Sequence, residues 1–566
     1  MSGKLSDRDS PRGVSPVGKS HVDRTNVDVE AAAPRGFAQW FGGPKTTVGP
    51  RIGPVLDSIT IAAEDSDDSA SAILHRQKEA EQGADIQYRS CSWQMTAALL
   101  FSEYICLVSI PNLPRSHGAA LVAPYLSNSL KWRRAAFCIG AIMSFPWSYS
   151  ILGLFPGLLL TVVVSMLVLY TSLILWEFCL RHPEVRDVCD IGQMIFWNQK
   201  WAWWFTAVMF LLNNTFIQGL HVLVGAKYLN TMTAADDNVA CRTVSYSVIM
   251  LIICWICSLP RTFEALSKLG AASAGFTFIS VLLATIFAGV EKHPAGYDPR
   301  PTYTTAAGKD AVGGDPLWTA LPVAGTTFVA GMSAFLNISY TFIGQITLPS
   351  FIAEMKEPRD FPKALWACTI AEIIVFGLVG SIIYVYTGNQ YMTAPAFGSL
   401  EDVYKKVSFS FMIPTLIFLG VLYASVSARF VFFRIFQNSR HKSEHTLIGW
   451  GTWALILLIT WIVAFIISQI IPFFSDLLSL MSALFDSFFG FIFWGVAYFR
   501  MRKVDGSLAL MKQRGIWGYA EAGLNILIIL TGILFLGPGT YASVESILLD
   551  FDPSSGGVFS CASNGL

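Results

Sequence analysis

The sequence predicts an all-α integral membrane protein with about eleven transmembrane helices. Of its 566 residues, 53% are apolar and 14% are charged, whereas about 25% of the residues in a typical soluble domain are charged. Apolar segments long enough to cross a bilayer recur along most of the chain. A soluble core could not bury this much apolar surface, so we expect lipid to be the solvent for most of the chain.

Three regions are predicted from these patterns. Residues 1–90 are polar and rich in Ser, Asp, Arg, Pro and Gly, which is typical of a disordered tail, here placed in the cytosol. Residues 91–538 form the transmembrane domain, and residues 539–566 form a short extracellular C-terminal tail. The ten Cys are scattered, several of them inside apolar runs, which argues against a zinc site or a disulfide framework. Cys241 and Cys561 both fall in segments placed outside and could pair.

Ten uninterrupted segments are predicted to span. They are Leu154–Phe178, Trp201–Gly225, Val244–Leu259, Leu266–Val290, Leu321–Leu348, Ala364–Gly388, Ser408–Phe433, Leu447–Ile471, Asp476–Phe499 and Ile516–Leu536. Residues 97–147 form an interrupted opening element. The total is eleven transmembrane helices if its two halves form one helix, and twelve if each half spans the membrane alone. With eleven helices and a cytosolic N-terminus, sixteen Lys and Arg fall in inside loops and seven in outside loops. This distribution favours eleven, with the C-terminus outside.

Two of the helices contain sequence features that break helices. The sixth reads "NISYTFIGQITLPS", with Gly344 and Pro349, and the first contains "GAIMSFPW", with Gly140 and Pro146. Interruptions at matching places in two halves of a chain are typical of a transporter binding site. Unwound backbone is tolerated at membrane depth only where it faces protein or a polar cavity, so we expect these breaks to hold a ligand. Simple packing is the alternative for each break taken alone.

Several long motifs resemble one family. "FIAEMKEPRDFPKAL" (351–365), "SLPRTFEALSKLG" (258–270), "IPFFSDLLSLMSALFDSFF" (471–489) and "WEFCLRHPEVRDVCDIGQMIF" (176–196) closely resemble segments of fungal neutral amino acid permeases of the amino acid/auxin permease family. The resemblance runs from about Tyr88 to Leu536. It implies eleven helices in a leucine-transporter-type fold, a 5+5 inverted repeat with broken helices 1 and 6 and one extra helix.

An anomalous insert splits the first helix. "EYICL" (103–107) and "AIMSFPW" (141–147) resemble the two parts of a helix that is continuous in the family, whereas Val108–Gly140 has no counterpart there. We hypothesise that these 33 residues are a translated intron retained in the gene model. The alternative is a genuine insertion that loops into the cytosol or an external vestibule.

The breaks supply the candidate substrate contacts. Backbone groups there are expected to hold the carboxylate and ammonium of an amino acid. Apolar side chains such as Ile142 and Phe342 would shape a pocket for a neutral side chain. The candidate substrate-binding residues are Ala141, Ile142, Met143, Ser144, Tyr340, Thr341, Phe342 and Gly344.

Five residues are candidates for proton or ion coupling. His221, in the third helix, resembles a His of the family and suits a proton relay, unless it is a neutral His bonded to a carbonyl. Asp486, in the tenth helix, is a candidate proton carrier that departs from the family pattern. Gln345 stands where relatives often carry His, which puts transfer of their coupling mechanism in doubt. Ser425 and Ser427 keep a sodium-like site open.

The function predicted from these features is proton-coupled uptake of neutral amino acids, aliphatic or aromatic, across the plasma membrane by alternating access. The alternatives are a vacuolar exporter of the same fold and a non-transporting amino acid receptor. No HExxH or nucleophile elbow is present, so an enzyme is not expected. No cofactor beyond the coupling ion, H⁺ or Na⁺, and no nucleic-acid partner are expected. The expected partners are the substrate and the lipid bilayer.

Overall fold

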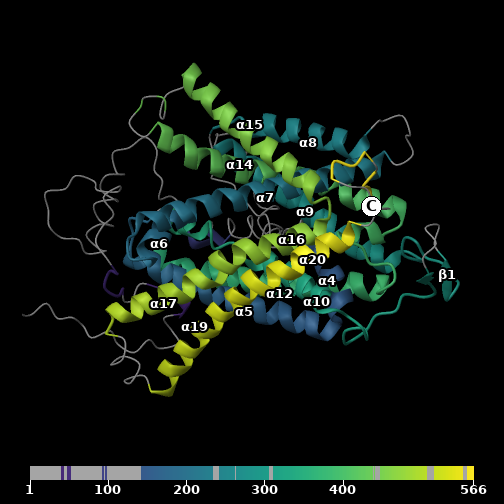
Figure 1. The fold of residues 1–566 in the computed structure, drawn as a ribbon, viewed down its shortest axis with the longest axis horizontal. Coiled ribbons are helices and arrows are strands. Elements are labelled where there is room, and N and C mark those ends of the chain that lie inside the picture. The colour runs from purple at the N-terminus through teal and green to yellow at the C-terminus, as the bar shows by residue number, and fades with distance from the viewer. Residues whose placement is uncertain are drawn as a thin grey trace, which may run out of the picture.

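The computed structural model describes residues 40–43, 48–52, 92–94, 96–97, 142–185, 187–233, 241–261, 263–304, 310–436, 439, 441, 446–506, 515–551, 558–561 and 563–566. Long helices run side by side between two ends of the molecule, and a small hairpin projects beyond one end (Figure 1). Ala141 and the insert at 108–140 lie outside the described residues, so the hypothesis about the insert stays a prediction.

The described part is almost entirely helical. Its α-helices are α4 (Phe145–Leu152), α5 (Leu154–Arg181), α6 (Val188–Ile195), α7 (Lys200–Met232), α8 (Arg242–Ser258), α9 (Phe263–Val290), α10 (Phe328–Phe342), α11 (Leu348–Glu354), α12 (Phe361–Thr387), α13 (Asp402–Ser410), α14 (Ile413–Ile435), α15 (Leu447–Ile470), α16 (Phe474–Met481), α17 (Phe493–Val504), α19 (Ile516–Leu534) and α20 (Thr540–Asp550). Short 3₁₀ turns are η4 (Ile142–Ser144), η5 (Pro358–Asp360) and η6 (Ala396–Ser399), and π-helical segments are η8 (Ser482–Ile492) and η9 (Phe535–Gly539). Strands β1 (Thr302–Thr304) and β2 (Asp310–Val312) pair antiparallel, with Thr302 opposite Val312.

The predicted membrane-spanning segments are confirmed. Seven helical stretches are long and apolar enough to cross a bilayer, and three further apolar helices are shorter, within the described residues. These ten coincide with the ten predicted segments, although the sixth begins at Phe328 rather than at Leu321. The opening segment contributes η4 and α4. The chain is therefore a multi-pass membrane protein.

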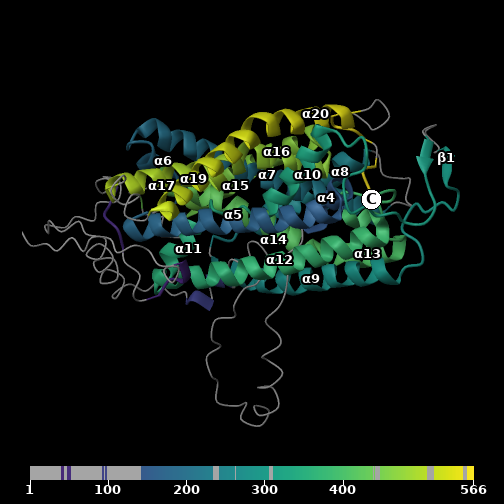
Figure 2. The same cartoon turned by 90° about the horizontal axis from the view of Figure 1, so that it is seen from below.

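Apolar side chains cover the outer faces of the bundle. On α15, Leu455, Ile459 and Ile462 are exposed at spacings of three and four residues, and Leu527 and Leu530 are exposed on α19. Such a stripe faces one side of a helix. An exposed apolar surface of this extent is typical of contact with lipid rather than water. Figure 2 shows α20 along one side of the bundle and α9, α12 and α13 along the opposite side.

The last helix is longer than predicted. The sequence analysis ended it at Leu536 and placed a tail at 539–566, but helix continues through η9 and α20 to Asp550. Pro538 removes one backbone donor inside this helix, and the local π-helical turn absorbs the disruption. The boundary was misplaced because Pro and Gly at 537–539 are ordinarily signals for the end of a helix.

One end of the bundle is closed by a disulfide and is called the disulfide end below. Cys241, which precedes α8, is bonded to Cys561, a pairing that the sequence left open. Residues beyond Cys561 continue along the same end. Asn230 donates to the side-chain oxygen of Asn564 (2.6 Å), and the Lys405 ammonium donates to the carbonyl of Leu566 (3.0 Å). The C-terminal segment therefore links α7, α8 and α13.

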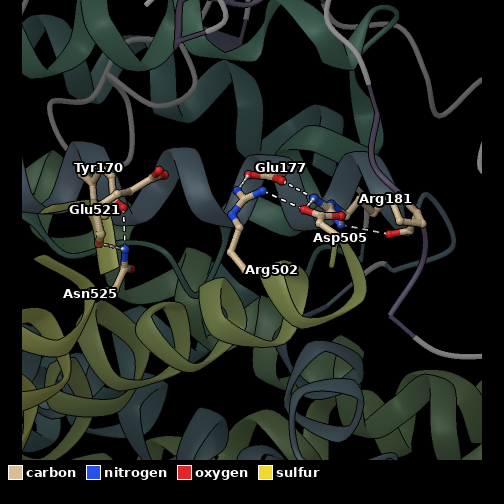
Figure 3. Close-up of polar contacts among 8 residues, drawn as sticks. Tyr170, Glu177, Arg181, Arg502, Asp505, Glu521 and Asn525 are labelled. Atoms are coloured by element: carbon tan, nitrogen blue, oxygen red, sulfur yellow. Dashed lines mark hydrogen bonds and ion pairs between the residues drawn. The ribbon is translucent and has the colours of Figure 1, made fainter. Parts of the chain in front are cut away.

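The opposite end, called the basic end, is held by buried ion pairs between α5 and α17 (Figure 3). Arg181 contacts Asp505 (2.7 Å) and Glu177 (2.6 Å), and Arg502 contacts Glu177 and Asp505 at 2.8 Å each. The Arg181 side chain is fully buried and that of Asp505 is 2% exposed. Each guanidinium thus bridges two carboxylates away from solvent, a geometry in which charge-assisted hydrogen bonds are strongest.

Part of the N-terminal region is docked on the basic end, which differs from the disordered tail expected for residues 1–90. Trp40 lies 5.5 Å from the Tyr170 ring, and Trp366 donates its indole N–H to the Trp40 carbonyl (3.2 Å). Arg51 pairs with Glu184. Although burial alone would raise it, hydrogen bonds from His182 and Arg51 lower the pKa of Glu184 to about 2. Glu184 is therefore ionised at neutral pH. Composition averaged over 90 residues concealed these anchors.

We expect Asp505→Asn to lower the free energy of unfolding by about 3 kcal/mol, because it leaves two buried guanidinium groups to share one carboxylate, that of Glu177. Thermal unfolding in detergent measures the change. The control is Asp360→Asn, which breaks the more exposed pair with Lys363 and should cost less than about 1 kcal/mol. Equal losses in the two variants would contradict the structural role of the buried network.

We expect Cys241→Ser to remove the sensitivity of thermal stability to reductant and to destabilise the protein by about 2–4 kcal/mol. Cys257, a free cysteine of α8, provides the control, since Cys257→Ser should behave as the unaltered chain does. Peptide mapping without reduction should recover a cross-linked fragment containing Cys241 and Cys561. Recovery of these two peptides unlinked would show that the bond does not form.

Candidate functional site

The sixth spanning helix is broken where the sequence predicts. Its first part, α10, ends at Phe342, and its second, α11, begins at Leu348. Pro349 is the second residue of α11 and has no N–H to donate to the carbonyl of Gln345, and its ring would clash with that carbonyl in a continuous helix. Five residues at membrane depth, Ile343–Thr347, consequently lack regular helical hydrogen bonds.

The break leaves backbone donors free. In the described part of the chain, the N–H groups of Gly344, Gln345 and Ile346 donate no hydrogen bond. The carbonyl of Gly344 accepts from both the N–H (3.1 Å) and the hydroxyl (2.9 Å) of Thr347. Gly344 and Gln345 are buried. Unsatisfied N–H groups away from water are costly, so this segment is suited to an anionic group such as a carboxylate.

The described part of the first helix begins with a 3₁₀ turn. Ile142, Met143 and Ser144 form the 3₁₀ turn η4, and all three are buried. Pro146 occupies the second position of α4, where a missing N–H costs nothing because the first turn has no partners within the helix. The first N–H groups of α4 therefore point back toward η4.

The fold brings the two breaks together. Both η4 and α4 pack against α10 and α12. Phe145 of α4 meets Phe342 of α10 edge-on with ring centroids 6.0 Å apart, and Phe376 of α12 lies 5.1 Å from Phe145 and 5.5 Å from Phe342. All three rings are buried. They form an aromatic cluster between the unwound segments, an environment that favours an uncharged apolar group.

The remaining helix-six candidates are placed around this cluster. Tyr340 and Thr341 are half-buried, and the Thr341 hydroxyl donates back to the carbonyl of Asn337 (3.3 Å). Gln345 donates to the hydroxyl of Thr171 on α5 (3.0 Å), and its side-chain carbonyl has no partner among the described residues. The seven described substrate candidates therefore gather at one place; the eighth, Ala141, is outside the described residues.

Apart from Gln345, which lies in the helix-six break, the coupling candidates are divided between two other locations. His221 of α7 packs against Gly420 of α14, and Ser427 of α14 accepts a hydrogen bond from Asn214 of α7 (3.1 Å). Ser425 is buried on the same helix. His221, Ser425 and Ser427 thus lie where α7 packs against α14. Among the described residues, these contacts do not reach the aromatic cluster.

Asp486 lies in η8 and is 5% exposed. It is close enough to Tyr340 to interact with it electrostatically. One residue of the break also contacts this segment: a Cβ placed on Gly490 would lie 2.8 Å from the side chain of Ile343. Glycine at 490 therefore allows η8 to approach the helix-six break closely.

Two contributors to the site were not predicted from the sequence. Phe376 completes the aromatic cluster and Thr171 holds Gln345, but both belong to helices that continue without a break. No local pattern marks them, because their role depends on the packing of α5 and α12. Within the described residues, no group of three or more His, Cys, Asp or Glu side chains could hold a metal ion.

Comparison with known proteins identifies a family of transporters over the same part of the chain. Residues 134–542, which include both breaks, match the family described as "Transmembrane amino acid transporter protein". The chain is 29% identical over 431 residues to the "N amino acid transport system protein" of Neurospora crassa, covering 75% of this chain and 86% of that protein. It is also 29% identical to a "Transmembrane transporter" of Gibberella moniliformis, covering 77% and 88% of the two chains. Over a membrane domain built around two broken helices, this chain belongs to the family of transmembrane amino acid transporter proteins.

Proposed function

We propose that this transporter carries neutral amino acids into the cell together with protons. The observation that supports this most directly is the juxtaposition of two unwound segments with an aromatic cluster. Free N–H groups at Gly344–Ile346 would bind the substrate carboxylate. Free carbonyls at the end of α10 would bind its ammonium group. The three phenylalanines would receive an uncharged side chain.

Substrate selectivity follows from the charges near the cluster. The side chains that form it are apolar, and Asp486 interacts with Tyr340, two residues before Phe342 of the cluster. An acidic or basic substrate side chain would have to lose its hydration beside phenylalanine rings. This desolvation costs roughly several kcal/mol. We therefore propose aliphatic and aromatic amino acids as substrates.

The proposed location is the plasma membrane, with the basic end in the cytosol and the disulfide end outside. The excess of Lys and Arg in the loops at the basic end supports this orientation. The Cys241–Cys561 bond agrees with it, since disulfides persist in oxidising surroundings. Two other functions compete with this proposal. One is a vacuolar exporter of the same fold, and the other is an amino acid receptor that does not transport.

The test is uptake of labelled neutral amino acids in transport-deficient cells, at acid and neutral external pH. We expect saturable uptake that is faster at acid pH and is blocked when the proton gradient is collapsed. The chain should be compared with a form that lacks residues 108–140. Uptake by the shortened form alone would support the retained-intron hypothesis, and equal uptake by both would contradict it.

Three outcomes separate the competing functions. Fluorescent tagging distinguishes the plasma membrane from the vacuole. Substrate binding to purified protein without uptake in either form would favour the receptor. Uptake that requires sodium and ignores pH would favour ion binding near Ser425 and Ser427 over proton coupling.

We expect Phe342→Ala to weaken apparent affinity for neutral amino acids about tenfold, because it removes a ring from the aromatic cluster (about 1.4 kcal/mol). Competition assays against labelled substrate measure the change. Phe155 is 64% exposed on the outer face of α5, so Phe155→Ala is the matched control and should leave affinity unchanged. A similar loss in both variants would show that the effect is not local to the proposed pocket.

A further inference from the structure

A row of buried polar side chains runs between three neighbouring helices of the bundle. In the chain direction from the disulfide end, Asp476, Ser479, Ser482 and Asp486 follow one another along α16 and η8 at spacings of three, three and four residues. All four are buried. At 1.5 Å per residue the row extends about 15 Å into the bundle. The row is therefore a polar line from one end of the molecule toward its middle.

Helix α10 contributes a second polar line beside the first. It packs against α16 and η8, and Tyr340 faces Asp486. Ser333 and Asn337 lie seven and three residues before Tyr340, on the same face of the helix. Asn337 is 0% exposed, and neither its amide nitrogen nor its amide oxygen has a hydrogen-bond partner among the described residues.

Helix α20 supplies the third side. Its Ser546 donates a hydrogen bond to Asp476 (2.8 Å), and Thr540 and Ser543 follow toward the interior. The hydroxyls of Thr540 and Ser543 are buried and have no partner among the described residues. These three lines of residues, from α10, α16–η8 and α20, are called the polar seam below.

Several buried polar atoms of the seam have no hydrogen-bond partner. Among the described residues, they are both amide atoms of Asn337, one carboxylate oxygen of Asp486, and the hydroxyls of Ser333, Thr540 and Ser543. Burying a polar group without a hydrogen bond costs about 1–3 kcal/mol on protein scales. Packing alone would favour apolar side chains at these positions. The presence of these polar side chains together points to a ligand that donates and accepts hydrogen bonds along the row.

The shape of the seam favours a proton over a metal cation. A sodium or calcium ion requires several oxygen ligands around one point, whereas the two carboxylates are ten residues apart on one helix. Serine and threonine hydroxyls both donate and accept hydrogen bonds, and a carboxylate can bind and release a proton. A row of such groups can pass a proton from one member to the next.

We propose that the polar seam carries the coupling proton from the disulfide end, through Asp476, to Asp486 beside the helix-six break. This inference rests on the proposed function and adds the route of the proton. Asp550 of α20 faces Asp476, and Tyr340 of α10 faces Asp486. Because Ile343 packs against Gly490, a change of charge at Asp486 acts on a segment that contacts the proposed substrate site directly.

The test combines two transport measurements on Asp486→Asn, in whichever form of the chain transports. Asparagine has nearly the same shape but cannot carry the proton. We expect the ratio of uptake at acid and neutral external pH to fall to about one. Exchange of labelled for unlabelled amino acid, which needs no net proton movement, should remain within about twofold of the unaltered chain. Asp476→Asn should slow acid-stimulated uptake by at least about threefold and spare exchange.

The matched control is Glu372→Gln. Glu372 is also a buried carboxyl group in a spanning helix, where it accepts from Cys368 (3.2 Å), but it lies on α12 outside the seam. It should retain full acid stimulation. Acid stimulation equal to that of the unaltered chain in both Asp486→Asn and Asp476→Asn would overturn the proposal.

If Asp486→Asn does not reach the membrane, Asp476→Asn and Ser482→Ala provide the result, and normal acid stimulation in both would overturn the proposal. Asp486→Glu keeps a titratable group and should retain acid stimulation with a shifted pH midpoint. Failure of the proposed function has a different signature. In that case the unaltered chain itself would show no uptake or no response to pH.

Discussion

Every backbone N–H and C=O group at membrane depth needs a partner, and this requirement organises the whole molecule. Regular helices meet it without help, so the outer faces of α15 and α19 can present only apolar side chains. The segments at Ile142–Ser144 and Ile343–Thr347 depart from the regular α-helix, and Ile343–Thr347 does not meet this requirement by itself. The fold places both breaks in the interior, where α5 and α12 enclose them. The position of the site is thus a consequence of where unpaired backbone can be tolerated.

The two ends of the bundle are stabilised by different chemistry. At the basic end, Arg181 and Arg502 join α5 to α17 through buried ion pairs. At the disulfide end, a covalent bond joins the start of α8 to the C-terminal segment. Neither set of contacts involves η4 or the Ile343–Thr347 break. Neither the ion pairs nor the disulfide therefore fixes the broken segments, which suits the movement that the proposed alternating access requires.

Much of the architecture could be predicted because lipid imposes length and composition on each spanning segment. The ten segments and the break before Pro349 follow from local signals, whereas the Cys241–Cys561 pair was only left open by the predicted topology. Three features could not be predicted. Pro538 is a typical signal for the end of a helix, yet the helix continues through a π-helical turn to Asp550. Trp40 and Arg51 dock only because α5 and its following loop present Tyr170 and Glu184. Phe376 and Thr171 join the site through packing, which no local pattern encodes.

The Cys241–Cys561 bond also has a consequence for how the protein is made. Its two cysteines are 320 residues apart in the chain, and all the spanning helices from α8 onward lie between them. The first cysteine emerges during synthesis long before its partner exists, and the two can meet only after α19 and α20 have entered the membrane. The bond is therefore a mark of completed assembly. A chain arrested or misinserted at any intermediate helix would keep Cys241 as a free thiol, which distinguishes it chemically from the finished transporter.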